Sequence, residues 1–171
     1  QLPYTLEWNV ALEQALGKQQ TLSVSYIGAV GRRLIQSAQV LSPNSNYLEA
    51  ALIANTASSD YNALQVQFQR RLSHGLQVLS SYTWSHSIDD ASAGSFGSFS
   101  NLGIPGSNSN VNRGPSDFDI RHSFSAGVTY DIPAPKGRAF MNSVLRGWST
   151  DDFILARSAP PVDVSDELFG Q

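Results

Sequence analysis

Residues 4–12 read Tyr-Thr-Leu-Glu-Trp-Asn-Val-Ala-Leu, and every even-numbered position in this stretch holds a large apolar side chain. Four further stretches largely repeat the pattern, at residues 22–26, 64–68, 76–84 and 124–130. An apolar residue at every second position is typical of a β-strand with one apolar and one polar face. The sequence therefore predicts an all-β fold.

The two faces of these predicted strands differ in a way that indicates a membrane. The apolar, even-numbered positions are rich in aromatic residues, whereas the odd-numbered positions are mostly polar. The polar set comprises Glu7, Glu13, Gln65, Gln67, Gln69, Arg71, Gln77, Ser81, Thr83 and Ser85. An apolar exterior and a polar interior are features of transmembrane β-barrels. We therefore expect an antiparallel barrel wall.

Composition narrows the class of protein further. The formal net charge is −3 and the isoelectric point is about 5.5, so the chain lacks the basic surface that binds a phosphate backbone, and we expect no nucleic-acid partner. Cysteine is absent, so disulfides are not used. No apolar run approaches the roughly 18 residues of a transmembrane helix, whereas a barrel strand needs only about ten alternating residues.

Turn residues divide the alternating stretches into three hairpins and about six strands. The expected strand pairs are 4–16 with 21–30, 61–72 with 76–88, and 122–131 with 140–157. Two connections of about thirty residues, 31–60 and 89–121, join the hairpins at the other end. Short turns on one side and long loops on the other are normal for outer-membrane barrels, whose long loops are extracellular. In the first loop, Asn46 and Glu49 form a capping box that predicts a short helix over 50–54.

The second long connection carries no charged residue between Asp90 and Arg113 and is rich in Gly, Ser and Asn. Phe96, Phe99 and Asn101 are candidate ligand-binding residues in this flexible segment, because aromatic faces and amides suit sugars and apolar side chains. In the alternative interpretation, the apolar side chains of the loop pack against the rim of the barrel itself.

Two long segments carry a family resemblance. Residues 61–90, from Tyr-Asn-Ala-Leu-Gln-Val-Gln to Trp-Ser-His-Ser-Ile-Asp-Asp, and residues 113–133, which begin Arg-Gly-Pro-Ser-Asp-Phe-Asp-Ile-Arg-His, closely resemble the barrel of TonB-dependent outer-membrane receptors. The nearest branch is the Oar-like receptors, which carry a carboxypeptidase-regulatory-like domain. The resemblance extends over about residues 22–164. The pair Asp151-Asp152 departs from it, since the family is usually uncharged and apolar there.

The resemblance implies energy-coupled uptake of a scarce ligand, such as a siderophore, an oligosaccharide or a peptide. It implies a plugged barrel of twenty-two strands in the outer membrane of a Gram-negative bacterium, surrounded by outer-membrane lipid. An inner-membrane energy-transducing complex would act through regions absent from this sequence. Six strands cannot close such a barrel, so we expect residues 1–171 to form one partial barrel domain of a larger receptor. No cofactor is implied.

Three residues of the strand-entry segment, Asp117, Asp119 and Arg121, are expected to have a structural role at the barrel rim, where acid and base pair. Together with other groups near the second loop they could instead supply metal ligands. That metal set would be Asp89, Asp90, Asp117, Asp119 and His122. We favour the structural role and expect no metal site.

A hydrolase triad of Ser85, His86 and Asp89 is also unconvincing, because adjacent residues on a strand face opposite ways and no Gly-x-Ser-x-Gly elbow exists. We therefore expect no catalytic residue and no enzyme. Two alternatives to the transport protein remain at this stage. One is a secreted β-sandwich binding module, whose strands also alternate. The other is a complete small barrel with a structural role in the outer membrane.

Overall fold

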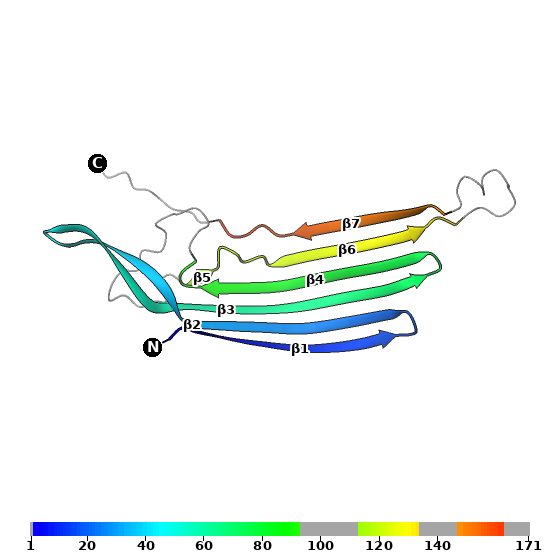
Figure 1. Cartoon of the computed structure of the whole chain (residues 1–171), viewed down its shortest axis with the longest axis horizontal. Coiled ribbons are helices and arrows are strands. Elements are labelled where there is room, and N and C mark those ends of the chain that lie inside the picture. Colours follow the sequence, from blue (N-terminus) through cyan, green and yellow to red (C-terminus); the bar gives the residue numbers. More distant parts are fainter. Residues whose placement is uncertain (1, 93–112, 134–146, 163–171) are drawn as a thin grey trace.

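The computed structural model describes residues 2–92, 113–133 and 147–162. The strands are β1 (Tyr4–Leu16), β2 (Gln20–Asn44), β3 (Tyr47–Ser73), β4 (Leu76–Asp89), β5 (Gly114–Pro115), β6 (His122–Asp131) and β7 (Ser149–Arg157). They form one antiparallel sheet in the order β1-β2-β3-β4-β6-β7, with the short β5 paired to the end of β4 (Figure 1). The predicted all-β antiparallel architecture is confirmed. Among the described residues, no helix has the length and apolarity needed to cross a membrane.

The predicted hairpins agree closely with the structure at their short turns. The predicted strands 4–16 and 122–131 coincide with β1 and β6. Gly17 and Gly75 adopt φ values of 73° and 78° in the two tight turns, a conformation that glycine reaches without steric cost. The return strand of the third hairpin begins at Ser149 rather than at residue 140. Residues 140–146 lie outside the described residues, and 147–148 precede the strand.

The connection over residues 31–60 was predicted to be a long loop with a short helix, and both expectations are wrong. β2 and β3 continue past the rest of the sheet as a two-stranded ribbon, here called the arm (residues 34–57), which turns at Ser45 and Asn46 (Figure 1). Asn44 Oδ1 accepts the Asn46 N–H at 2.9 Å, so the proposed helix cap belongs to a turn. Cross-strand pairing satisfies the backbone groups that a helix would have paired internally.

The arm leaves the sheet at an irregularity in strand pairing. The register shifts between Gly31 and Leu34 and again between Leu34 and Ile35. Arg33, within the first shift, has a φ of 57°, and its guanidinium lies 5.9 Å from the centre of the Tyr4 ring. A bulge bends and twists a strand locally. This explains why the arm runs at an angle to the other strands in Figure 1.

The sheet has no second layer among the described residues. The buried apolar side chains are only Ala57, Ala63 and Ala126, while Leu6, Val10 and Leu12 are 58%, 63% and 75% exposed. In a β-sandwich the apolar faces of two sheets meet in a core. The arrangement therefore contradicts the β-sandwich alternative.

The register keeps the two faces of the sheet separate from β1 to β7. Even-numbered residues pair with even-numbered ones throughout this part of the sheet, as in the row Leu12, Val24, Val66, Tyr82, Phe124 and Ala156. We call the even-numbered side the apolar face and the odd-numbered side the polar face. The pairing shows that the alternation seen in separate stretches of sequence forms one continuous pair of surfaces.

The band of apolar side chains moves along the strands from one edge of the sheet to the other. On β1 it covers Tyr4 to Leu12, and on β6 it covers Phe124 to Tyr130, where Phe124 lies in the same row as Leu12. The far end of the band therefore moves by six residues, from the row of Leu12 to the row of Tyr130, which is about 20 Å along the strands, and the four strand spacings are about 19 Å. The band is therefore inclined by roughly 45°, close to the strand tilt of membrane barrels.

Gly28 lies on the apolar face because a large neighbour needs the space. A Cβ atom placed on Gly28 would lie 2.2 Å from Cε2 of Trp8, its partner on β1. Gly28 lies within β2, and its lack of a side chain allows the indole to lie across the strand.

Candidate functional site

Polar side chains gather at the end of the sheet from which the arm projects. We call this end the rim and define it by residues 57–60, 85–92 and 113–122. β3 and β4 meet here, and the chain from Arg113 through β5 to His122 runs beside the end of β4, with which β5 pairs (Figure 1). The rim lies beyond the apolar band of β3, which covers residues 64–68.

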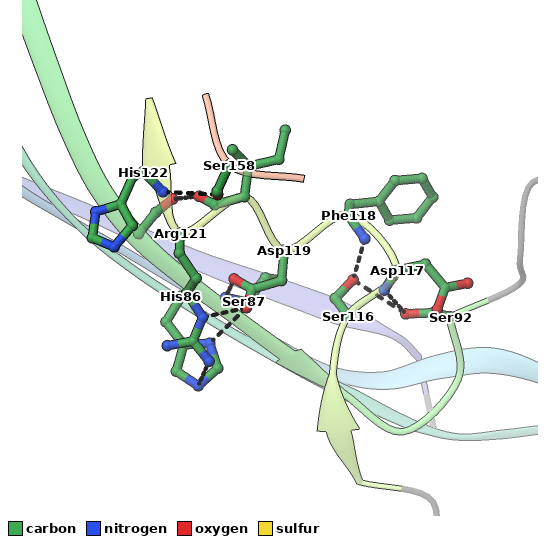
Figure 2. A network of polar contacts seen from close by, with 12 residues as sticks. His86, Ser87, Ser92, Ser116, Asp117, Phe118, Asp119, Arg121, His122 and Ser158 are labelled. Atoms are coloured by element: carbon green, nitrogen blue, oxygen red, sulfur yellow. Dashed lines mark hydrogen bonds and ion pairs between the residues drawn. The ribbon is translucent and has the colours of Figure 1, made fainter. Parts of the chain in front are cut away.

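Asp119 is the centre of the first rim cluster, shown in Figure 2. Its Oδ1 accepts the Ser87 N–H at 2.8 Å, and its Oδ2 lies 2.6 Å from Arg121 Nε and 3.2 Å from His86 Nδ1. Asp119 is only 2% exposed. Burial by itself raises the pKa of Asp119, but the Ser87 N–H and the Arg121 guanidinium outweigh that effect and hold it below the ordinary 3.8.

His86 bridges the acid and the base of this cluster. Arg121 Nη2 lies 3.2 Å from His86 Nε2, and Nη2 can only donate. A neutral imidazole that accepts at Nε2 and donates its Nδ1 proton to Asp119 satisfies both contacts. Beside it, the Ser85 hydroxyl donates to the Ile120 carbonyl at 2.7 Å. Both side chains thus tie β4 to the segment that leads into β6.

Asp60 is the centre of a second cluster, on β3. Arg32 Nη2 lies 2.7 Å from Asp60 Oδ1, and Arg113 forms an ion pair with Oδ2 of the same carboxylate. Burial raises the pKa of Asp60, but the hydrogen bonds from Arg32 and Arg113 lower it overall. The carboxylate thereby joins the base of the arm to the chain just before β5.

A third set of contacts fixes the chain on the other side of residues 93–112. Asp90 accepts the Ser58 N–H at 2.7 Å and the Ser58 hydroxyl at 2.9 Å. Asp89 accepts the Ser92 N–H at 3.0 Å, and Ser92 Oγ lies 3.1 Å from Ser116 Oγ. Both ends of the segment 93–112 are therefore attached to the same rim.

The predicted site residues fall into three groups. Asp119 and Arg121 form an ion pair at the rim. The Asp117 N–H donates to Ser92 Oγ at 3.2 Å, so the backbone of Asp117 belongs to the neighbouring contacts in Figure 2 rather than to that pair. The candidate ligand-binding residues Phe96, Phe99 and Asn101 lie outside the described residues.

The residues considered as metal ligands are dispersed. His122 Nδ1 lies 2.8 Å from the Tyr82 hydroxyl, and the two rings stack at 6.2 Å, on the apolar face and away from Asp119. In the described ranges, no group of three or more acidic, histidine or cysteine side chains is arranged to hold a metal ion.

Sequence reasoning missed Asp60, Arg32 and Arg113, which form the second cluster. The register supplies the reason: Val30 pairs with Asp60, so Arg32, in the irregularity just before the arm, is a near neighbour of that carboxylate. Arg113 is 53 positions away from Asp60 in sequence. Opposite charges at strand ends were the available signal, but without the register they could not be matched to one another.

The geometry defines a class of protein: an antiparallel wall with one inclined apolar band, one polar face and a rim braced by internal ion pairs. Over residues 1–169 the chain matches the family described as Outer membrane beta barrel domain. The chain belongs to this family, and the protein is an outer-membrane barrel protein of a Gram-negative bacterium. Neither the curated proteins nor the solved structures gave a match.

Proposed function

We propose that the chain forms part of the wall of a TonB-dependent outer-membrane receptor of the Oar-like branch, which takes up a scarce ligand by energy-coupled transport. The ligand would be a siderophore, an oligosaccharide or a peptide, and the energy would come from an inner-membrane complex through regions outside these 171 residues. In this proposal the apolar face contacts outer-membrane lipid, the polar face lines the lumen, and no residue is catalytic.

The observation that carries the proposal is the difference between the two ends of the sheet. At one end, β1–β2 and β3–β4 are joined by turns of a few residues. At the other end lie the arm and the two chain ends that flank residues 93–112, which are fixed by Asp89, Asp90 and Asp60. A purely structural barrel has no need of a long segment held on a braced base, whereas a receptor uses such segments for ligand capture.

Energy coupling is the property that separates this proposal from a passive or structural barrel. Cells that carry the full-length protein should accumulate at least one radiolabelled probe from a panel of maltotriose, trialanine and a ferric hydroxamate. An uncoupler of the proton gradient should abolish accumulation while leaving surface binding intact. Uptake that is unaffected by the uncoupler would indicate a passive channel and would overturn the proposal.

The role of the braced segment needs its own experiment. We propose that Phe96, Phe99 and Asn101 assist capture at the mouth of the barrel. Excision of residues 92–110 from the full-length receptor should abolish binding of the accumulated probe to whole cells while surface assembly stays normal. Unchanged binding would contradict the capture role, and failed assembly would favour packing of the segment on the rim.

A further inference from the structure

Three large apolar side chains of the polar face lie close together near the β7 edge of the sheet. Leu79 on β4 and Phe153 on β7 both pair in register with Gly127 on β6, and Leu155 lies one row further along β7. Leu79 and Phe153 are 47% and 76% exposed. Exposure of such side chains on a mostly polar face is unfavourable unless something apolar covers them.

The space between these two side chains is a hollow of about 270 Å³. Gly127 forms its floor, because it has no side chain and a Cβ there would meet nothing within 4 Å. The remaining lining on the polar face is Gln77, Thr129 and Asp151. The hollow therefore has two apolar walls and a polar end.

The polar end is acidic. Asp151 Oδ1 accepts the Thr129 hydroxyl at 2.6 Å, and Asp131 lies diagonally across the β6–β7 pair on the same face. Toward β1, the nearest described arginine or lysine on the polar face is Arg71 on β3. It lies three strand spacings from β7, which is roughly 14 Å. Within residues 2–92, 113–133 and 147–162, no lysine or arginine lies beside these two carboxylates, and their charge favours a cation at this end of the hollow.

We propose that the hollow over Gly127 is a subsite for a basic side chain, lysine or arginine, of a peptide ligand. The aliphatic stem of that side chain lies between Leu79 and Phe153, and its cation binds Asp151 with help from Gln77. A neutral sugar ring could stack on Phe153 but would leave the carboxylates without a charge partner. The ligand of the proposed uptake would then be a basic peptide. This inference rests on the proposed function, because only transport brings the ligand to the polar face.

Residues 1–171 contain no cysteine. Gly127→Cys in the full-length protein places a thiol on the floor of the hollow, where the added side chain has room, and the unsubstituted full-length protein gives the background labelling. A cationic aminoethyl methanethiosulfonate should modify this thiol at least about tenfold faster than the anionic sulfonatoethyl reagent. Asp151→Asn in the same background should remove that preference. Ser125→Cys, one row away on the same strand and face, is the matched control and should show little preference.

Protection then identifies the occupant. Acetyl-Ala-Lys-Ala-amide should slow modification of Gly127→Cys, whereas the same peptide with norleucine in place of lysine should not. Equal rates for the two reagents, or equal protection by norleucine or maltotriose, would overturn the proposal. So would a Gly127→Cys thiol that neither reagent reaches while Ser125→Cys reacts, since the protein itself would then fill the hollow. Labelling does not depend on energy coupling, so uptake that ignores the uncoupler would count against the proposed function alone.

Discussion

Asp119 is the residue on which the first rim cluster depends, because it accepts hydrogen bonds from both the Ser87 backbone and the Arg121 side chain while almost fully buried. Asp119→Ala leaves these donors without an acceptor and should destabilise the folded protein by roughly 2 kcal/mol. The measurement is the temperature at which the protein loses its folded mobility on a gel in dodecyl sulfate. Asp131→Ala, at an exposed acid at the opposite end of β6, is the control and should leave that temperature unchanged.

The same residue predicts a dependence on acid. The pKa of Asp119 is lower in the folded protein than its ordinary value of 3.8, so its contribution to stability is complete above that value and is lost as the pH falls through the lower, folded pKa. We expect the unfolding temperature to decrease between about pH 4 and pH 2. Asp119→Asn should show a weaker decrease over this range. An identical decrease in the variant would show that other groups determine the acid sensitivity.

Val66 and Gln67 offer a direct comparison of the two faces. Val66 lies on the apolar face between Val24 and Tyr82, and Gln67 is the next residue on the polar face. Val66→Arg places a charge in the middle of the apolar band and should cost about 2 to 4 kcal/mol, whereas Gln67→Arg should cost much less. Unfolding by urea in lipid vesicles would measure both. Similar losses in the two variants would refute the assignment of the faces.

The arm is the element that is most independent of the sheet. Within the described residues its strands pair only with each other beyond the bulge at Gly31 to Leu34. A two-residue Asn-Gly turn that joins Ile35 to Asn55 in place of residues 36–54 should therefore leave assembly and the unfolding temperature unchanged. A variant that fails to assemble would show that the arm supports the wall.

Protease access should distinguish the two ends of the sheet. Tyr47 and Leu48 at the tip of the arm are 63% and 88% exposed, so chymotrypsin added to intact cells should cut there. Trypsin should reach Lys18, in the turn between β1 and β2, only after the outer membrane is opened. Cleavage at Lys18 in intact cells would invert the proposed orientation.

The sequence predicted those strands whose boundaries depend only on residues close by in the chain. β1 and β6 could be located to the residue because alternation, a turn and a polar boundary coincide at each end. The arm could not, since residues 50–54 have good helix formers and a plausible cap, and only pairing with the distant residues 36–40 makes them a strand. Local preference is a weak guide where a cross-strand partner exists.

In the candidate site, too, contacts between residues close in sequence could be predicted and contacts between distant residues could not. Asp119 and Arg121 are two positions apart, so their pairing could be anticipated from the segment itself. Asp60 and Arg113 are brought together by the register of β3 with β4 and by the path of the chain beside the end of β4. Neither feature can be predicted from one of the two segments alone. The hollow over Gly127 could not be foreseen either, because it requires the alignment of β4, β6 and β7.

At the scale of the whole molecule, the described residues form one curved layer with no packed core. Its apolar face carries large exposed side chains from β1 to β7, and only lipid or further protein can cover so large an apolar surface. In the described sheet β1 and β7 are the edge strands. Their outer edges present backbone groups that must find partners within a bilayer.

Because the apolar band is inclined, the depths of two tryptophans in the bilayer report the tilt of the strands. Trp8 lies near the middle of the band on β1, whereas Trp84 lies at the rim end of the band on β4. In the register of the sheet, however, Trp84 is two residues further from the rim than Trp8. In vesicles of brominated lipids, bromines deep in the acyl chains should quench the fluorescence of a Trp8-only variant more strongly, and shallow bromines that of a Trp84-only variant. Strands that stood upright in the bilayer would give the reverse order, so two emission measurements would report the tilt of the wall.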